Sequence, residues 1–578
     1  MTAAPTRRGP PRSRRARPRA HQERPAPAKG GGQLQIIPLG GVGEIGKNAT
    51  LIQSGSDALL VDAGLRFPEE ELLGIDLVIP DFSLIAQRHV RLHGVVLTHG
   101  HEDHIGALSF LLDREHPMVV GSPLTVAMAK ERAAERSKEA RWRPTAYREE
   151  VGLGPFQVEL VRVSHSIPGA AAVVVRAGGR AVVVSGDFKF DQTPVDGQPT
   201  DVARLAEVGE AGVTALLLDS TNSERPGYTP SERVAGEALA RRAEGVGGRI
   251  IVTTFSSNVH RLQQVIDLGA AIGRRVGVVG RSMEQSVRIA QATGHLKAPK
   301  GVLATVEEVR QLPDDRVIIL ITGSQGEPLS GLSRVAAGTH RALSLKRGDT
   351  VIFSASAIPG NEAVVARTID NLFRRGAEVI YGRESGVHVS GHGAAEELKL
   401  MTNLLRPQVF IPVHGEYRML VQNSRLAAQT GIPASRILLG ENGTIFEFGA
   451  HPRISGRLQA GNVLVDGLGV GDVGAIVLRD RQHLARDGMV IVLLGLDQAT
   501  GEVVSGPDVV SRGFVYMREA EPLLAEVRGR VSDTIKGLQK TQGTDWAEVK
   551  RAIRDDLSRF LYDRTRRQPM ILPMVVEV

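Results

Sequence analysis

The stretch Val95–Leu108, VVLTHGHEDHIGAL, decides the fold and the chemistry of this 578-residue chain. A Val- and Leu-rich run typical of a buried strand leads into a turn that carries His99, His101, Asp103 and His104, and an apolar helical pattern follows. Imidazoles and carboxylates placed side by side are costly to bury unless they are paired or bind a metal. The turn therefore predicts a metal site at the carboxyl end of a strand, where ligand sites concentrate in α/β folds.

Composition restricts which residues can bind that metal. The chain has no Cys, which excludes disulfides, thiolate nucleophiles and Cys-ligated zinc or iron–sulfur sites, so the ligands must be His, Asp or Glu. No apolar run approaches the ~18 residues of a membrane span. An apolar secretory segment is also missing from the beginning of the sequence. We therefore expect a cytoplasmic protein that does not enter a membrane.

The net charge of +7 comes from one end of the chain. Residues 1–33 carry eight Arg and one Lys against Glu23, so the remainder is nearly neutral. This segment has no Leu, Ile, Val or Phe, and we expect a disordered basic tail. It is either a flexible polycation that loosely holds RNA, DNA or an acidic partner, or a solubilising extension without a dedicated role. Net charge alone therefore says nothing about the substrate of the body.

Three regions follow the tail. Short Val- and Leu-rich runs punctuated by Gly and Pro predict strands up to about Ser185. From about Ser231, helical and strand patterns alternate, which predicts a parallel sheet with crossover helices. After about Gly456 we expect strands at Ala475–Leu478 and Val490–Leu494. A long helix should follow, with its packed stripe at Trp546, Val549, Ile553, Leu557 and Leu561.

Six more motifs extend the His and Asp pattern. They are Asp62 in LLVDAG, His165 in VSHSIPG, Asp187 in VVVSGDFKF, Asp219 in DSTN, His392 in HVSGHG and His414 in FIPVHGEY. In this order they resemble the metallo-β-lactamase fold hydrolases. The 226 residues between Asp187 and His414 resemble the inserted domain of the β-CASP group, which processes nucleic acids. LGGVGEIGKN, GSQGEP and PMILPMVVEV extend the resemblance to the ribonuclease J family over nearly all of residues 34–578.

The resemblance implies an α/β fold class. A metallo-β-lactamase αββα sandwich is interrupted by an inserted α/β β-CASP domain, and a small α+β C-terminal domain follows. The expected division is a sandwich at 34–225 and 376–455, a β-CASP domain at 226–375, a linker at 456–466 and a C-terminal domain at 467–578.

The resemblance also implies roles for these residues. One metal ion would bind His99, His101 and His165, and a second would bind Asp103, His104 and His414. Asp187 would bridge the two ions, and Asp62 would orient a ligating His. His392 is the candidate proton donor or oxyanion stabiliser, although it could be only structural, and Asp219 would support the site. The donor set suits Zn²⁺, with Mn²⁺ or Mg²⁺ as alternatives.

The implied activity is a two-metal ribonuclease that degrades single-stranded RNA 5′-to-3′ from monophosphate ends, cuts internally as well, and serves RNA maturation and mRNA decay. A pocket for the terminal phosphate is expected at His388, Ser390 and Gly391, with Ser354, Ser356 and Ser324 nearby, although each Ser could serve only a turn. Arg261, Arg281 and Arg418 could line the RNA path. The resemblance further implies a homodimer or tetramer formed through the C-terminal domain, and membership of an RNA-degradation complex is an additional expectation.

Three other functions stay open on the residues alone. A DNA nuclease of the same superfamily has the same chemistry, because both polymers are phosphodiesters. A hydrolase of a small ester, thioester or lactam would need no inserted domain. A non-catalytic RNA-binding scaffold would have lost ligands, whereas all seven are present here.

Overall fold

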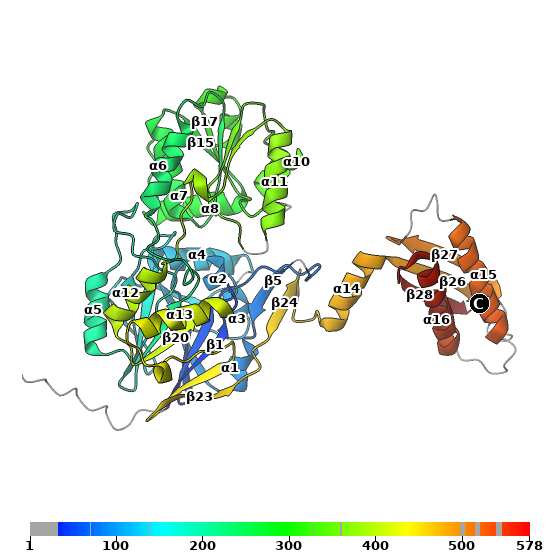
Figure 1. Cartoon of the computed structure of the whole chain (residues 1–578), viewed down its shortest axis with the longest axis horizontal. Helices are drawn as coiled ribbons and strands as arrows, with labels where there is room; N and C mark the ends of the chain where they lie inside the picture. Colours follow the sequence, from blue (N-terminus) through cyan, green and yellow to red (C-terminus); the bar gives the residue numbers. More distant parts are fainter. Residues whose placement is uncertain are drawn as a thin grey trace, which may run out of the picture.

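The computed structural model describes residues 33–577, apart from 70, 137, 328, 359–360, 498–502, 515–520 and 539–545. The predicted basic tail, except Gln33, lies outside the described residues. Figure 1 shows two lobes in contact and a C-terminal lobe, in red, set apart from them. No helix in the described ranges is long and apolar enough to cross a membrane.

Two mixed sheets form the first lobe. The eight-stranded sheet has the order β23 (Pro452–Arg457), β22 (Thr444–Phe448), β1 (Leu34–Gly40), β3 (Ala49–Ser54), β4 (Asp57–Val61), β6 (Arg91–Val96), β7 (Met118–Gly121), β8 (Arg141–Pro144). The six-stranded sheet has the order β20 (Val409–Val413), β13 (Ala215–Asp219), β12 (Arg180–Val184), β11 (Ala171–Ala177), β10 (Phe156–Arg162), β9 (Glu150–Leu153). Strands β20, β22 and β23 come late in the sequence, so the chain returns to this lobe after the insertion.

The two sheets pack face to face and helices cover their outer faces. The inner core consists of apolar side chains from both sheets, such as Ile36, Leu59, Leu160 and Val173. One outer face is covered by α1 (Ser83–Gln87), α2 (Glu102–Ile105), α3 (Leu108–Leu111) and α4 (Pro123–Ala134). The other is covered by α5 (Val202–Ala211), α12 (Ala395–Leu405) and α13 (Tyr417–Gln429). The predicted αββα sandwich is confirmed.

The second lobe is the inserted domain. Its sheet is entirely parallel, in the order β16 (Leu303–Ala304), β15 (Arg275–Val279), β17 (Val317–Ile321), β14 (Ile250–Thr253), β18 (Thr350–Phe353), β19 (Glu378–Ile380). One face packs on α6 (Glu232–Ala243), α7 (Val259–Ala271) and α8 (Arg281–Ala292). The other packs on α9 (Val306–Val309), α10 (Gly331–Ala337) and α11 (Glu362–Arg374). Its strands are buried on both faces, which explains their unbroken Ile and Val runs.

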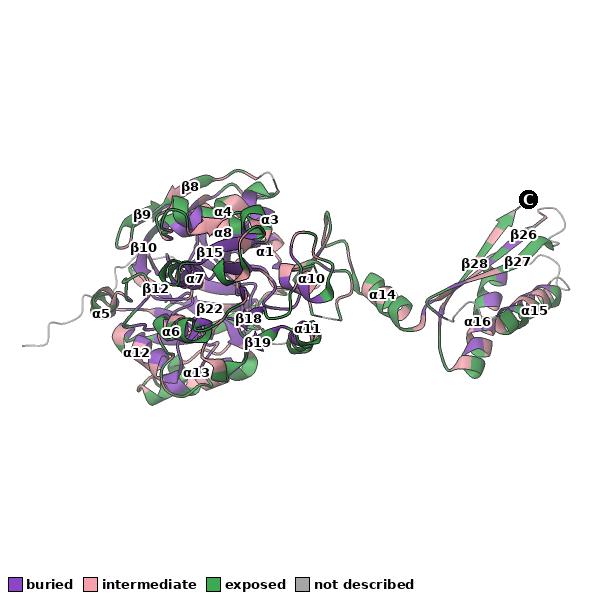
Figure 2. Cartoon of the chain, turned by 90° about the horizontal axis from the view of Figure 1, so that it is seen from above, coloured by how far each residue is buried: buried purple, intermediate pink, exposed green. Residues whose placement is uncertain are grey.

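The C-terminal lobe is a three-stranded sheet with two helices on one face. Central β26 (Met489–Leu496) pairs with β27 (Val503–Arg512) and β28 (Met570–Glu577). Helices α15 (Glu521–Leu538) and α16 (Trp546–Thr565) cover one face, as Figure 2 shows. The predicted stripe is buried at Val549, Ile553, Leu557 and Leu561, while the Trp546 side chain lies outside the described residues.

The connection to this lobe differs from the expectation. The strand predicted at Ala475–Leu478 is wrong, because these residues open helix α14 (Ala475–Asp487), in which no residue is buried. The expected linker, 456–466, contains the whole of strand β24 (Asn462–Asp466), which pairs with β5 (Leu77–Pro80) of the first lobe and with β25 (Gly469–Val470). This pairing ties the linker to the first lobe.

Candidate metal centre

The predicted metal-binding turn joins β6 to α2 and is held against the segment after β4. The Ala63 N–H donates to the His104 carbonyl at 2.8 Å, and the Leu65 N–H donates to the Glu102 carbonyl at 3.0 Å. A Cβ at Gly64, between them, would lie 1.6 Å from the Asp103 carbonyl oxygen. Residue 64 must therefore lack a side chain for the turn to be held in this position.

The structure brings the first group of predicted ligands together. His101 Nδ1 lies 3.0 Å from His99 Nε2 and 3.1 Å from His165 Nε2. Asp187 Oδ2 lies 3.5 Å from His99 Nε2 and 3.7 Å from His165 Nε2. Four ligand atoms from three separate segments thus surround one point.

The second group shares Asp187 with the first. His104 Nε2 lies 3.2 Å from Asp187 Oδ1 and 3.5 Å from Asp103 Oδ2. His414, which enters directly after β20, places Nε2 3.5 Å from Asp103 Oδ2 and Nδ1 2.7 Å from Asp187 Oδ1. One carboxylate oxygen of Asp187 faces each group, which is the arrangement of a bridging ligand.

Asp62 orients the turn from behind. Its carboxylate accepts from the Thr98 N–H at 2.8 Å and from the Thr98 hydroxyl at 2.9 Å. It also lies 2.8 Å from His104 Nδ1. A ring N–H donated here leaves the Nε2 lone pair of His104 directed at the second group. Asp62 is not itself within either ligand group.

His392 and Asp219 lie beside the two groups. His392 Nδ1 is 2.8 Å from Asp219 Oδ2, and His392 Nε2 is 3.8 Å from Asp187 Oδ2. The Thr221 N–H and hydroxyl donate to the other oxygen of Asp219 at 2.9 and 2.7 Å. The Asp219 carboxylate is therefore fixed, and it holds the His392 ring with Nε2 toward the metal groups.

The protonation of the first group suits metal binding. Burial lowers the pKa of His99 and His165 well below the ordinary value and lowers the pKa of His101 to about 4. These three imidazoles are neutral at neutral pH and offer lone pairs.

Carboxylates dominate the second group. Burial acts to lower the pKa of His104 and His414, but neighbouring carboxylates, Asp187 first among them, outweigh it. The net effect raises the pKa of His104 and raises the pKa of His414 to about 10. This group favours positive charge, carried either by protons or by a cation.

Two divalent ions fit these residues. The His165 Nδ1–H is donated to the Gly391 carbonyl, so Nε2 of that neutral ring carries a lone pair, and it lies 3.1 Å from His101 Nδ1. His99 Nε2 lies 3.0 Å from the same His101 atom, so a cation placed between these rings could be bound by all three. A tetrahedral site with metal–ligand bonds of about 2.0–2.1 Å has ligand atoms about 3.3–3.4 Å apart. The observed separations of 3.0–3.7 Å bracket this value.

The segment that carries His392, residues 387–392 (the His392 loop), is held on its sandwich side through backbone carbonyls. The His165 Nδ1–H donates to the Gly391 carbonyl at 2.8 Å, and Lys189 Nζ donates to the Ser390 carbonyl at 3.2 Å. A Cβ at Gly391 would lie 2.6 Å from His165 Cε1. An imidazole of the first His/Asp group is thus bonded directly to this loop.

Two more carbonyls of the His392 loop accept hydrogen bonds, one from the segment that follows β13 and one from the inserted domain. The His392 carbonyl accepts from Asn222 Nδ2 at 2.8 Å and from the Thr229 hydroxyl at 2.7 Å. The Val387 carbonyl accepts from the Ser354 hydroxyl at 2.6 Å and from the Arg261 guanidinium. Both lobes therefore determine the conformation of the loop.

The predicted phosphate-binding residues fall into two sets. His388, Ser390 and Gly391 lie in the His392 loop, and buried Ser354 reaches it through Val387. Ser324 is buried next to Gln325, whose amide donates to the carbonyl of exposed Ser356. Among these described residues, no hydrogen bond joins Ser324 or Ser356 to the His392 loop. The structure therefore brings only the first set to one place.

The sequence did not reveal a buried ionic network beneath the loop. Glu232 lies 2.7 Å from Arg261 and 3.4 Å from Lys189, and all three side chains are nearly inaccessible to solvent. Burial raises the pKa of Glu232, but Lys189 and Arg261 outweigh it and the net pKa is lowered. Arg261 is thus an internal residue, which corrects its interpretation as part of the RNA path. No short motif marks this network, because its members are far apart in the sequence.

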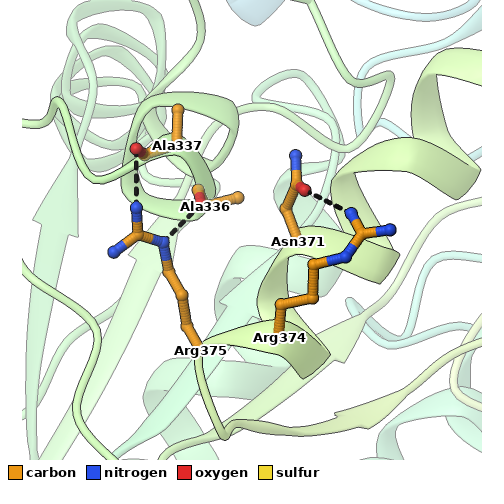
Figure 3. A pocket seen from close by; sticks show the side chains of 5 residues that line it. All are labelled: Ala336, Ala337, Asn371, Arg374 and Arg375. Atoms are coloured by element: carbon orange, nitrogen blue, oxygen red, sulfur yellow. Dashed lines mark hydrogen bonds between the residues drawn. The ribbon is translucent and has the colours of Figure 1, made fainter.

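A surface hollow of about 350 Å³ in the inserted domain holds none of the predicted site residues. Figure 3 shows its lining between α10 and α11. Arg375 donates to the carbonyls of Ala336 and Ala337 at the end of α10, and Arg374 donates to Asn371. Both guanidiniums are therefore engaged in capping and intrahelical bonds.

The sandwich, the inserted parallel domain and the two His/Asp groups define a metal-dependent hydrolase of the metallo-β-lactamase superfamily with a β-CASP insertion. Family profiles agree along the chain. Residues 42–224 match the metallo-beta-lactamase superfamily, and residues 247–372 match the ribonuclease J beta-CASP domain. Residues 376–436 match the Zn-dependent metallo-hydrolase RNA specificity domain, and residues 476–578 match the ribonuclease J C-terminal domain.

Similar proteins narrow this class. The chain is 42% identical to Ribonuclease J2 of Bacillus subtilis (strain 168), covering 94% of this chain and 99% of that protein. It is also 42% identical to Ribonuclease J 1 of Streptococcus pyogenes serotype M3, covering 94% and 98%. The chain belongs to the ribonuclease J family. A crystal structure of a protein of unknown function from Enterococcus faecalis V583 shares the fold, with a TM-score of 0.53 and 15% identity over 72% of this chain and all of that one.

Proposed function

We propose that this protein is a two-metal ribonuclease that degrades single-stranded RNA 5′-to-3′ from monophosphate ends and also cuts internally. Such an activity would serve RNA maturation and mRNA decay. One observation carries the proposal: two His/Asp groups share the carboxylate of Asp187, and His392 lies beside them. Paired divalent ions of this kind are a recurrent solution for hydrolysing phosphodiesters.

Each of the two His/Asp groups would hold one ion. His99, His101 and His165 would hold one, Asp103, His104 and His414 would hold the other, and Asp187 would contact both. The nitrogen-rich donors favour Zn²⁺, with Mn²⁺ as the second choice and Mg²⁺ as the least suited. When bound, the ions would neutralise the phosphate charge and lower the pKa of the attacking water.

His392 would give a proton to the departing 3′ oxygen of the RNA. The Asp219 carboxylate accepts from Nδ1–H, so Nε2 is the nitrogen that faces the reacting groups. Burial lowers the pKa of His392, but Asp219 and Asp187 outweigh it and raise the pKa above the ordinary value. A raised pKa keeps the ring protonated and able to act as the acid.

The His392 loop supports a pocket for a 5′ phosphate. The carbonyls of four of its residues already accept hydrogen bonds, from His165, Lys189, Asn222, Thr229, Arg261 and Ser354. In the part of the chain that the structure describes, no protein acceptor binds the N–H groups of residues 388–391. Successive backbone donors of this kind form an anion-binding nest. The buried Nδ1 of His388 also has no protein partner.

Matched oligonucleotides test this activity. The full-length protein is given the same sequence as RNA and as DNA, with a 5′ monophosphate, triphosphate or hydroxyl, in Zn²⁺ or Mn²⁺. We expect stepwise release of nucleotides from the 5′ end, fastest on monophosphate RNA. A His101→Ala, Asp103→Ala double variant is the control and should be inactive. Equal cleavage of DNA would favour the DNA nuclease, and no cleavage of either polymer would refute the proposal.

We also propose that the C-terminal lobe joins copies of the chain into dimers or tetramers. Leu572, Met574 and Val576 of β28 are 39–57% exposed on the sheet face opposite α15 and α16. Such an apolar strand face is unusual on a surface that only meets water. Light scattering of the full chain and of a version ending near Gly456 tests this, and equal oligomeric states would refute it.

A further inference from the structure

Two arginines beside the His392 loop have no acidic partner. Arg225 and Arg383 are both exposed, and no carboxylate among the described residues lies within ion-pair distance of either guanidinium. Neighbouring cations are paired, since Arg418 lies 3.2 Å from Glu224 and Arg261 lies 2.7 Å from Glu232. Glu224 thus binds Arg418, although it is the residue next to Arg225.

Arg225 is fixed at the edge of the predicted phosphate nest. Its N–H donates to the Asn222 carbonyl at 2.9 Å, and its own carbonyl accepts from the Ala395 N–H at 2.9 Å. The Asn222 side chain in turn donates to the Ser390 hydroxyl and the His392 carbonyl, each at 2.8 Å. The backbone of Arg225 is therefore anchored between the two segments that hold the loop.

Arg383 lies just before the His392 loop in the sequence. It begins a short 3-10 turn, Arg383–Ser385, that ends in Gly386 and leads into the His392 loop. His388 follows five residues after Arg383, a reach of at most about 18 Å even when fully extended. Arg383 thus lies on the segment that leads into the nest, and Arg225 lies on a segment that is hydrogen-bonded to Asn222 and Ala395 beside it.

The two positive charges act on each other and on the nest. Partial burial and the charge of Arg383 lower the pKa of Arg225. Burial, with Arg261 and Arg225 among the charges around it, lowers the pKa of His388 to about 4. Two like charges near each other repel, and an anion bound between them would relieve this repulsion. The charge of this surface therefore suits an anionic ligand.

We propose that Arg225 and Arg383 bind the 5′-terminal phosphate of RNA from its outer side and so set the preference for monophosphate ends. A terminal phosphate monoester carries a charge of about −1.5 to −2 at neutral pH, whereas an internal phosphodiester carries a single charge. Two guanidiniums outside a neutral nest match the doubly charged group. This inference rests on the proposed 5′-to-3′ activity.

Kinetics on two RNAs test the assignment. We compare wild type, Arg225→Gln, Arg383→Gln and the double variant on one sequence with a 5′ monophosphate or a 5′ hydroxyl. Arg242→Gln is the matched control, because Arg242 is an exposed arginine near the far end of α6. We expect each single variant to raise KM for the monophosphate RNA about three- to tenfold, with kcat within about twofold. KM for the hydroxyl RNA and all constants of the control should stay within about twofold.

A binding measurement separates this inference from the activity. Calorimetric titration of the full-length protein with adenosine 5′-monophosphate, against adenosine, requires no cleavage. The arginine variants should lose the affinity difference between the two ligands. The assignment is overturned if the variants keep the wild-type difference, or if they weaken both RNAs equally, which would indicate an internal phosphate. A wild type that binds adenosine 5′-monophosphate more tightly than adenosine but cleaves no RNA would refute the activity and leave the arginines supported.

Discussion

Replacing His392 by Ala should slow hydrolysis of RNA by about 10²–10⁴-fold while leaving RNA affinity nearly unchanged. The range corresponds to about 3–5 kcal/mol of transition-state stabilisation. The structure supports an effect of this magnitude on the rate, because His392 Nδ1 is hydrogen-bonded to Asp219 at 2.8 Å and His392 Nε2 lies 3.8 Å from Asp187. A proton on that second nitrogen has a fixed direction toward the reacting groups.

A change of leaving group isolates this role. In an RNA whose scissile 3′ oxygen is replaced by sulfur, the leaving thiolate is a weak base and needs no proton. Single-turnover rates should show that His392→Ala is slow on the oxygen linkage and close to wild type on the sulfur linkage. Asp219→Asn should behave in the same direction with a smaller loss, because the ring remains but its orientation is no longer fixed. His451→Ala, at an exposed histidine, is the control and should match wild type on both. Equal slowing of His392→Ala on the two linkages would refute the proton-donor role.

Three further substitutions test the surroundings of the site. Glu232→Gln leaves buried Arg261 without its carboxylate and leaves Lys189 with only Asp191, at 3.9 Å. It should cost about 3–5 kcal/mol, seen as a Tm lower by about 6–20 °C, whereas exposed Glu237→Gln on the same helix should shift Tm by less than about 2 °C. Because the pKa of Glu232 is lowered in the folded protein, its contribution to the free energy of unfolding is complete above about pH 4.5 and is lost as pH falls through the folded pKa. The Tm values of Glu232→Gln and Glu237→Gln should therefore converge in acid, and a Tm difference that does not change with pH would contradict this reasoning. Gly391→Ala places a Cβ within 2.6 Å of His165 and should lower both the amount of bound metal, measured by elemental analysis, and kcat. A variant with full metal content would count against this close approach. Asp62→Asn should weaken metal affinity about 10–100-fold in a chelator competition, and an unchanged affinity would show that its carboxylate does not orient the ligand.

Much of the fold could be predicted because its signals are local. The buried parallel strands of the inserted domain are recognisable as Ile and Val runs. The αββα sandwich was implied by the resemblance of the ordered His and Asp motifs to the metallo-β-lactamase fold hydrolases. The metal turn was recognisable for the same reason, since four of its ligand-type residues fall within six positions. At Ala475–Leu478 the local signal misled, because a short apolar run fits a strand or a helix equally well. The helix that forms there has no buried residue, so no periodic apolar face indicated it.

The network that holds the His392 loop could not be predicted, because its contacts join distant residues with ordinary local patterns. Lys189 and Ser390 are 201 positions apart, and Arg261 and Val387 are 126 apart. On helix α7, Arg261 has the appearance of a solvated cation, yet its side chain is fully buried. Ser354 likewise fits a turn or a phosphate pocket by sequence, whereas its hydroxyl donates to the Val387 carbonyl. Tertiary packing alone distinguishes these alternatives.

The same contacts determine what the inserted domain does at the site. The His392 loop receives hydrogen bonds from His165 and Lys189 of the sandwich and from Arg261 and Ser354 of the inserted domain. A tilt of one lobe relative to the other would have to break buried bonds on one side of this loop, each costly to leave unmade. The inserted domain therefore forms part of the wall that positions His392 and the N–H groups of residues 388–391. A phosphate bound in the nest and a phosphodiester bound at the metals would be held at a fixed separation, which is the condition for removing a defined product from an RNA end.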